Sequence, residues 1–283
     1  MKKKCLYIIF FILPAILWFL FNSVKEKEDK IFTIATEGYL RPYNFTHPDG
    51  TLDGFEIELG RYVCTHMHVK CSFVAQPFDG IIAGLNAGKY DAIMGGITAT
   101  VKREEIVSFS EPYSLAPLVF ATTKGSKYEN LPSSGQLFSL SENLLVARQS
   151  LREDIEATAG ATIGVVTGTT SDTLVNTFFK DNASVKEYKT VEPALLDLQA
   201  GRINMLAHSR AYLKAMQSTP GYGDLVMTGP FFKGPLLGRG AGIVIRKNEP
   251  ALLGKLNEAI DAAKADGTLK RLANKWIGFD VTP

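Results

Sequence analysis

The sequence predicts an α/β protein with two lobes. Its 283 residues exceed what one hydrophobic core usually needs. Short apolar strands alternate with helices of about ten residues, a pattern typical of βαβ units and parallel sheets. The run of strand, helix, strand, helix with a glycine stop, and strand occurs twice. The share of hydrophobic residues, 46%, against 21% charged residues is that of a folded globular protein.

The N-terminus carries an export signal. Lys2–Lys4 form a positive start, and residues 6–21 are almost wholly apolar. This pattern predicts a secretory signal peptide over residues 1–30. A small-x-small cleavage site is not evident at residues 21–24, so an uncleaved N-terminal anchor stays open as the alternative. In both interpretations the rest of the chain is exported.

The charge distribution excludes one large class of functions. Residues 1–30 hold six lysines and three acids, a formal charge of +3, whereas the whole chain carries +2, which leaves −1 for residues 31–283. Nucleic-acid binders present a strongly basic surface. A near-neutral body therefore predicts that no nucleic acid is bound.

The first run of elements starts with a strand over residues 31–35 and a loop over 39–51, where Pro42, Pro48 and Asp49-Gly50 are turn signals. It continues with a helix over 52–67, a strand over 71–75, a helix over 78–87 that Gly88 ends, a buried strand over 91–94, a helical turn over 100–107 and a strand over 117–123.

The second run has strands over 163–166, 185–188 and 203–207 and helices over 170–179, 192–200 and 210–217. Two terminal helices follow, over 250–265 and 268–277, separated by Asp266-Gly267. Residues 126–159, with a helix-like stretch near 144–157, are interpreted as an excursion on the second lobe.

Two cysteines lie close together in the body. Cys64 ends one predicted helix and Cys71 starts the next strand, whereas Cys5 lies in the export signal. In an oxidising compartment this spacing favours a local disulfide. His66 and His68 between them suggest a metal cluster, but residues two apart point to different sides of a helix, so no metal is predicted.

Polar segments follow four of the predicted strands. In open α/β sheets, ligands bind beyond the carboxyl ends of the strands. These ends carry hydroxyl side chains, glycines and backbone N–H groups, which suit a small polar solute. The four segments are 36–38, 95–98 with Gly95 and Gly96, 167–170, and 208–209.

Five segments in order resemble a known family, the periplasmic solute-binding proteins of family 3, which are the receptors of ABC importers for polar amino acids and opines. The segments are Gly54-Phe55-Glu56-Ile57-Glu58-Leu59 with Val63, Cys64 and Met67; residues 85–94; Thr98-Ala99-Thr100-Val101-Lys102-Arg103; Phe109-Ser110-Glu111-Pro112-Tyr113; and Ala265-Asp266-Gly267-Thr268-Leu269. The similarity covers about residues 31–283.

The resemblance implies the type II periplasmic binding fold, in which two lobes hinged by two crossing strands close around a solute. Lobe 1 would be residues 31–114 plus 232–283, and lobe 2 residues 115–231. Members with basic ligands also carry the disulfide that would join Cys64 to Cys71. The resemblance further implies a periplasmic monomer without a cofactor or catalytic residues, which hands its ligand to a membrane permease.

The resemblance also assigns binding residues. Arg103 would clamp the α-carboxylate of the solute, because a guanidinium forks onto a carboxylate with two charge-assisted hydrogen bonds. Thr98 would add a hydroxyl and an N–H, and Thr170, at a helix start on lobe 2, would complete the grip. Phe78 would form an apolar wall.

Three positions depart from, or refine, the family pattern. The lobe-2 aspartate that pairs with an α-ammonium aligns with Ser209, and a hydroxyl cannot neutralise a buried cation. The aromatic lid aligns with Leu40, with Tyr39 beside it, and Glu37 stands where members with basic ligands carry an acid. These residues predict a carboxylate ligand with a modified amine and a cationic or polyol arm, such as an opine; a standard amino acid stays open.

Other interpretations compete with this one. Arg103 and Glu37 as solvated charges, the threonines and Ser209 as helix caps, and Phe78 as core are the structural alternatives. An enzyme resembling cyclohexadienyl dehydratase is a second candidate, although Glu37 is the one obvious acid for proton transfer. A ligand-sensing receptor held by an uncleaved N-terminal helix is a third.

Overall fold

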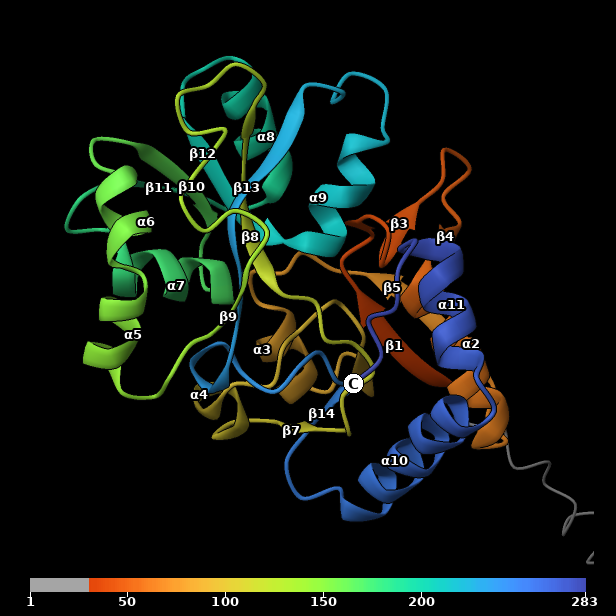
Figure 1. The fold of residues 1–283 in the computed structure, drawn as a ribbon. Coiled ribbons are helices and arrows are strands. Elements are labelled where there is room, and N and C mark those ends of the chain that lie inside the picture. Colours follow the sequence, from red (N-terminus) through yellow and green to blue (C-terminus); the bar gives the residue numbers. More distant parts are fainter. Residues whose placement is uncertain (1–30) are drawn as a thin grey trace, which may run out of the picture. The chain divides into compact units, whose positions relative to one another are not determined.

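The computed structural model describes residues 31–283 of the chain; the predicted signal peptide or anchor, with Cys5, lies outside the described residues. Residues from Phe32 to Pro283 form one compact unit. Two larger sheets and one small sheet organise this unit, with helices packed on their faces (Figure 1). The predicted alternation of strands and helices is therefore present in both halves.

The first sheet has the strand order β5-β1-β6-β14-β7. Strand β1 is central to its parallel part, since it pairs with β5 on one side and β6 on the other. The C-terminal strand β14 inserts antiparallel between β6 and β7. The bounds are β1 (Phe32–Thr36), β5 (Cys71–Ala75), β6 (Ala92–Ile93), β7 (Ser108–Phe109) and β14 (Val244–Ile245).

The helices of this part pack through apolar faces. Phe55, Leu59 and Val63 recur at helical spacing on α2 and are completely buried, in the cluster that also holds the inner faces of the two C-terminal helices. Figure 1 shows α10 and α11 alongside α2. The bounds are α2 (Phe55–His66), α3 (Ile81–Asn86), α4 (Val101–Glu104), α10 (Pro250–Ala265) and α11 (Thr268–Trp276).

The second sheet has the order β11-β10-β12-β8-β13-β9. Strands β11, β10 and β12 are parallel, and β8 runs antiparallel between β12 and β13. The excursion at 126–159 contributes the edge strand β9 and two helices. The strands are β8 (Leu118–Thr123), β9 (Leu137–Ser139), β10 (Thr162–Val166), β11 (Ser184–Tyr188), β12 (Met205–Ser209) and β13 (Leu225–Lys233). The helices are α5 (Leu144–Ser150), α6 (Arg152–Ala157), α7 (Thr170–Phe178), α8 (Val191–Gln199), α9 (Arg210–Gln217) and the 3-10 turn η1 (Pro235–Leu237).

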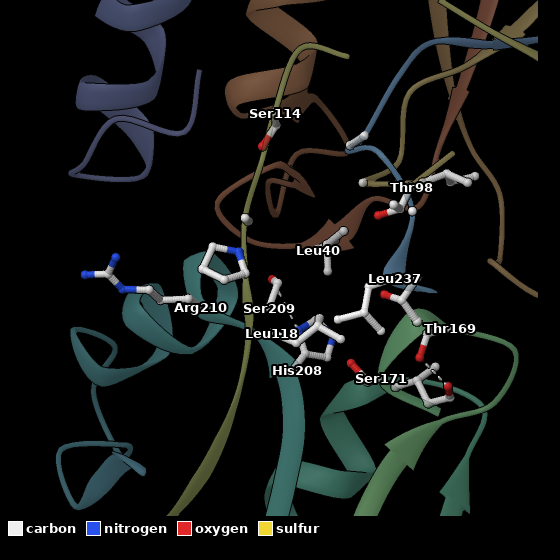
Figure 2. A pocket seen from close by; sticks show the side chains of 18 of the residues that line it. Leu40, Thr98, Ser114, Leu118, Thr169, Ser171, His208, Ser209, Arg210 and Leu237 are labelled. Carbon is white, nitrogen blue, oxygen red and sulfur yellow. Dashed lines mark hydrogen bonds between the residues drawn. The ribbon is translucent and has the colours of Figure 1, made fainter. Parts of the chain in front are cut away.

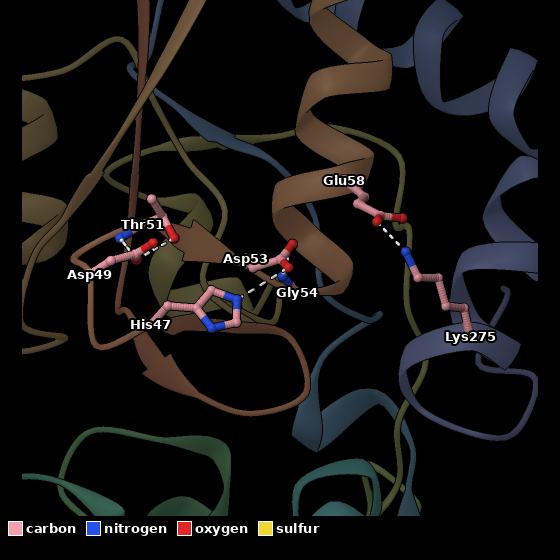
Figure 3. Close-up of polar contacts among 7 residues, drawn as sticks. All are labelled: His47, Asp49, Thr51, Asp53, Gly54, Glu58 and Lys275. Atoms are coloured by element: carbon pink, nitrogen blue, oxygen red, sulfur yellow. Dashed lines mark hydrogen bonds and ion pairs between the residues drawn. The ribbon is translucent and has the colours of Figure 1, made fainter.

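The segment predicted as a loop over 39–51 is instead partly a small sheet, made of β2 (Tyr39–Leu40), β3 (Asn44–Thr46) and β4 (Leu52–Asp53). Its turn is closed locally, as Figure 3 shows. Asp49 accepts hydrogen bonds from the backbone N–H and the hydroxyl of Thr51 at 2.9 and 2.7 Å. This Asx turn is closed by hydrogen bonds between residues only two apart. The strands of this small sheet have two or three residues, which is too short for a periodic pattern that would predict them.

Two more boundaries differ from the prediction for physical reasons. The helix expected from residue 52 begins at Phe55, because Leu52 and Asp53 pair with β3. The helix expected from residue 78 begins at Ile81, since Gly80 before it has a φ of 85°, which a helix cannot accommodate. The predicted disulfide between Cys64 and Cys71 is confirmed, with their Cα atoms 6.1 Å apart.

The chain passes between the two larger sheets twice, from β7 to β8 and from β13 back to β14. The two passages touch, because Ser114 and Ala241 form an antiparallel bridge. Ala241 also bridges to Thr98, so the segment after β6 is joined to the same place. The carboxyl ends of strands from both sheets therefore meet next to these passages.

Candidate functional site

A cavity of about 520 Å³ lies where the two sheets and the two chain passages meet. Its size is in the range of small-molecule sites. Figure 2 shows Thr98 on one side of it and His208 and Ser171 on the other, with Leu40, Leu118 and Leu237 between them. All nine predicted binding residues line this cavity: Glu37, Tyr39, Phe78, Gly95, Gly96, Thr98, Arg103, Thr170 and Ser209. Their contact with a ligand stays a prediction.

Arg103 holds its guanidinium at the boundary of the two halves. Thr100 caps the short helix α4 by accepting the N–H of Arg103 at 3.4 Å. One guanidinium nitrogen donates to the carbonyl of Thr98 at 2.8 Å, and the other donates to the carbonyl of Gly168, which follows β10, at 3.1 Å. Burial lowers the pKa of Arg103 to about 10, so the group stays charged at neutral pH. Its remaining N–H groups can serve an anion.

Glu37 directly follows β1 and is only 9% exposed. Burial, and then the neighbouring charge of Glu56, raises the pKa of Glu37 to about 8, although Tyr39 and Arg103 act in the opposite direction. The carboxyl group is therefore largely protonated at neutral pH unless a cation comes close. A cationic ligand group in the cavity would ionise it.

Aromatic side chains form the wall beside Glu37. The hydroxyl of Tyr39 accepts the backbone N–H of Phe78 at 3.1 Å, which joins the segments after β1 and β5. The Phe78 ring centroid lies 5.8 Å from the guanidinium carbon of Arg103, within range of a cation–π contact. Gly96 adopts a φ of 63°, a left-handed conformation that favours glycine, and a Cβ there would lie 2.9 Å from Cδ2 of Leu40.

The wall from the second sheet carries hydroxyl groups. Thr169 caps α7 by accepting the N–H of Asp172 at 3.3 Å, and Thr170 begins the helix. Ser209 caps α9 in the same way through Tyr212, also at 3.3 Å, and its oxygen lies 3.5 Å from Nδ1 of His208. The structural interpretation of Ser209 as a cap is thus confirmed, and the same side chain also lines the cavity.

The charges around the cavity are unequal. Among the described residues that line it, Glu37 is the single carboxyl group, whereas Arg103, Lys189, Arg210 and Lys233 are basic. Arg210 points away from the cavity in Figure 2, and its guanidinium carbon lies 4.6 Å from the ring centroid of Phe231 and 4.5 Å from that of Phe279.

His208 adds no positive charge to this wall. It lies 4.5 Å from the ring of Tyr212, measured between ring centroids. Burial lowers its pKa to about 4, so it is neutral at physiological pH. The wall contributed by the second sheet is therefore polar and contains no acid.

Several lining residues were not among the predicted nine. Thr169 and Ser171 belong to the same polar run as Thr170, and the run itself was the signal. His208 belongs to the polar segment 208–209 that follows a predicted strand, and that position was the signal. Ser114, Leu118 and Leu237 come from the two chain passages, and no local pattern marks them, since only tertiary packing brings these segments to the cavity.

The sequence model of the bacterial extracellular solute-binding proteins, family 3, matches residues 32–279. The chain belongs to this family. The resemblance inferred from the five segments is therefore confirmed. An octopine-binding periplasmic protein of Rhizobium meliloti is 39% identical over 90% of this chain and 93% of its own length. An L-arginine-binding protein of Pseudomonas aeruginosa is 30% identical over 89% and 90%.

Solved structures of the family share the fold. An ancestral arginine-binding protein bound to arginine superposes with a TM-score of 0.71 at 29% identity, covering 87% of this chain and 97% of that one. The predicted two-lobe α/β fold of the periplasmic binding proteins is thus confirmed for this family 3 member. In residues 31–283, no helix has the length and hydropathy to cross a bilayer. The same residues contain no group of three His, Cys, Asp or Glu side chains arranged for a metal ion.

Proposed function

We propose that this family 3 protein is the periplasmic receptor of an ABC importer and that it closes two lobes around an amino-acid derivative. We assign lobe 1 to residues 31–114 plus 232–283 and lobe 2 to 115–231. The strands of the first sheet fall within the former ranges, and the second sheet, apart from Phe232 and Lys233 at the end of β13, falls within 115–231, which supports this division. The cavity then lies between the lobes.

The observation that carries the proposal is the position of Arg103 at the cavity. Its guanidinium comes from α4, in the half that holds the first sheet, and already donates to the carbonyl of Gly168, which follows β10 of the second sheet. An α-carboxylate between them would accept hydrogen bonds from the guanidinium and from the hydroxyl and N–H of Thr98. The hydroxyl and N–H of Thr170, at the start of α7, would donate to it from the other side. The same anion would hold the two lobes together, which couples binding to closure.

The rest of the cavity defines the ligand further. Glu37, between Tyr39 and Phe78, suits a cationic arm such as a guanidinium. On the opposite side, Ser209 and His208 offer neutral groups where an α-ammonium would need a counter-charge. We therefore propose a ligand that supplies this counter-charge itself, through a substituted amine that carries a second carboxylate, as in octopine. The relative from Rhizobium meliloti is named as an octopine-binding protein.

Binding and turnover can be measured together. Isothermal titration calorimetry of the exported protein with octopine, arginine, histidine and glutamine should give a Kd in the micromolar range or tighter for at least one of them, with octopine bound most tightly. Nuclear magnetic resonance of the ligand during prolonged incubation should show no new product. Lack of binding by all four compounds at millimolar concentration would refute the receptor function.

The enzyme alternative and the partner have their own measurements. Product formed from prephenate or arogenate would favour a dehydratase on this scaffold. Crosslinking in intact cells should capture the protein as a monomer in the periplasm and, with ligand present, against the permease of an ABC importer. Mass spectrometry of the exported protein would show whether residues 1–30 are removed.

A further inference from the structure

Glu56 is a buried acid with no place at the cavity surface. It lies in the first turn of α2, is completely buried and is absent from the cavity lining. A buried carboxylate is costly unless hydrogen bonds replace its water. Glu56 has three donors, and each belongs to a different segment of the chain.

The first donors act on one oxygen. Oε1 accepts the backbone N–H of Gly96 at 2.7 Å and the hydroxyl of Tyr113. Gly96 follows β6 and lines the cavity between Gly95 and Ile97. Its φ of 63° gives this segment a sharp bend. The hydrogen bond to Glu56 therefore holds a cavity loop from behind.

The other oxygen reaches a second cavity loop through Asn44. Oε2 accepts Nδ2 of Asn44 at 2.6 Å, and Oδ1 of the same amide accepts the backbone N–H of Gly38 at 2.7 Å. Asn44 is also completely buried. Because the backbone N–H of Gly38 can only donate and a carboxylate can only accept, the orientation of the Asn44 amide is determined. Gly38 lies between Glu37 and Tyr39, which both line the cavity.

We infer that Glu56 is a positioning residue of the binding site, which holds the loop after β6 directly and the loop after β1 through Asn44. The inference rests on the proposed function. These two loops carry Glu37 and Tyr39 on one side and Gly95 and Gly96 on the other, so one carboxylate sets their spacing. Glu56 touches no ligand; it acts by pre-organising groups that do.

The hydrogen-bond directions provide a sharp test. In Glu56→Gln, the new amide N–H faces the N–H of Gly96 or the N–H of Asn44, whichever way it turns, so one loop is released. In the double variant Glu56→Gln with Asn44→Asp, the new aspartate accepts from both Gly38 and Gln Nε2, while Gln Oε1 accepts from Gly96. Every donor is satisfied again and the net charge is unchanged.

The measurements are Kd by calorimetry well below the Tm of each variant, Tm itself, and the amide proton shifts of Gly38 and Gly96 in glycine-labelled protein. The ligand is whichever of octopine, arginine, histidine or glutamine the unmodified protein binds most tightly. Glu56→Gln should weaken binding about tenfold or more and move one of the two amide signals upfield. The double variant should recover affinity to within about threefold. Asp154→Asn, at another completely buried acid that accepts the backbone N–H of Ser133 away from the cavity lining, is the matched control and should leave Kd unchanged.

The outcomes separate this inference from the proposed function. If the unmodified protein binds none of octopine, arginine, histidine and glutamine, the proposed function fails. If it binds and Glu56→Gln lowers Tm with an unchanged Kd, Glu56 is only structural and the inference is wrong. If Glu56→Gln does not fold, the double variant decides: recovery of folding and affinity supports the inference, and failure to recover either overturns it.

Discussion

Arg103 and Glu37 project into the cavity from the same half of the molecule, and burial affects them differently. Arg103 loses part of its hydration but keeps its charge, with a pKa of about 10. Glu37 loses its charge at neutral pH, with a pKa of about 8. At the residue scale, the charged Arg103 can therefore bind an anion in the unliganded site. Glu37 can pair with a cation only after its carboxyl group has lost its proton.

Replacing Arg103 by alanine should weaken ligand binding by about 2–5 kcal/mol, because a buried carboxylate would lose its charged partner. Calorimetry on the folded variant measures this loss. Lys102→Ala, at the neighbouring exposed position of α4, should leave Kd unchanged and is the matched control. Equal affinity in Arg103→Ala and the unmodified protein would mean that the anion binds elsewhere.

Glu37 should make the binding of a cationic ligand depend on pH. A cation favours the ionised carboxylate, so below pH 8 binding expels a proton and affinity should rise with pH, by at most about tenfold per unit, and then level off above 8. Calorimetry of arginine or octopine at pH 7 in buffers of different ionisation enthalpy should show release approaching about one proton.

Two comparisons check this assignment to Glu37. His208, with a pKa of about 4, and Tyr39, raised to about 12 by burial, do not titrate in the same range. Glu37→Gln should abolish the proton release and reduce the affinity for the cationic ligand. Proton release that persists in this variant would assign the effect to another group.

At the element scale, most helices and longer strands were predicted within a residue or a few, but the nine-residue strand β13 was not, because Gly229 and Pro230 interrupt its apolar pattern. The helix over 250–265 matches α10, and glycines mark the ends of several others because their φ angles stop a helix. The two-residue strands β2, β4, β7 and β14 were not predicted, since two residues show no periodicity. They exist because neighbouring chain segments supply their hydrogen-bond partners.

The disulfide between Cys64 at the end of α2 and Cys71 at the start of β5 joins two elements away from the cavity lining. Replacing both cysteines by serine should lower the free energy of unfolding by about 2–3 kcal/mol, because the unfolded chain gains freedom over a short loop. Urea denaturation measures this change. Kd for the ligand should stay the same; a large loss of affinity would show that this clip also shapes the site.

At the scale of the whole molecule, two chain passages connect the two sheets, and residues from both sheets line the cavity. The contact from Arg103 to Gly168 is one direct hydrogen bond between the two halves. The Arg210 guanidinium of α9 packs between Phe231 and Phe279, which joins the second sheet to the C-terminal segment. Ligand in the cavity would add bonds to both walls at once.

Saturating ligand should therefore stabilise the entire fold. At a hundred times its Kd, a ligand that binds only the native state adds about 2.7 kcal/mol, and for a domain of this size Tm should rise by roughly 5–10 °C. Differential scanning calorimetry with and without octopine or arginine measures the shift. A single transition that moves as a whole is expected, whereas a transition that splits would show that ligand stabilises one half alone.

The sequence by itself determined the α/β class, the family, the disulfide and the nine predicted residues that line the cavity, six of which lie in the polar segments after predicted strands. These features follow from local periodicity, turn residues and short motifs. Only the tertiary structure decided the charge states of Glu37 and His208 and the hydrogen bonds from Glu56 to Asn44 and Gly96. Burial and contacts between residues far apart in the chain create these properties, and the local sequence around each residue does not determine either of them.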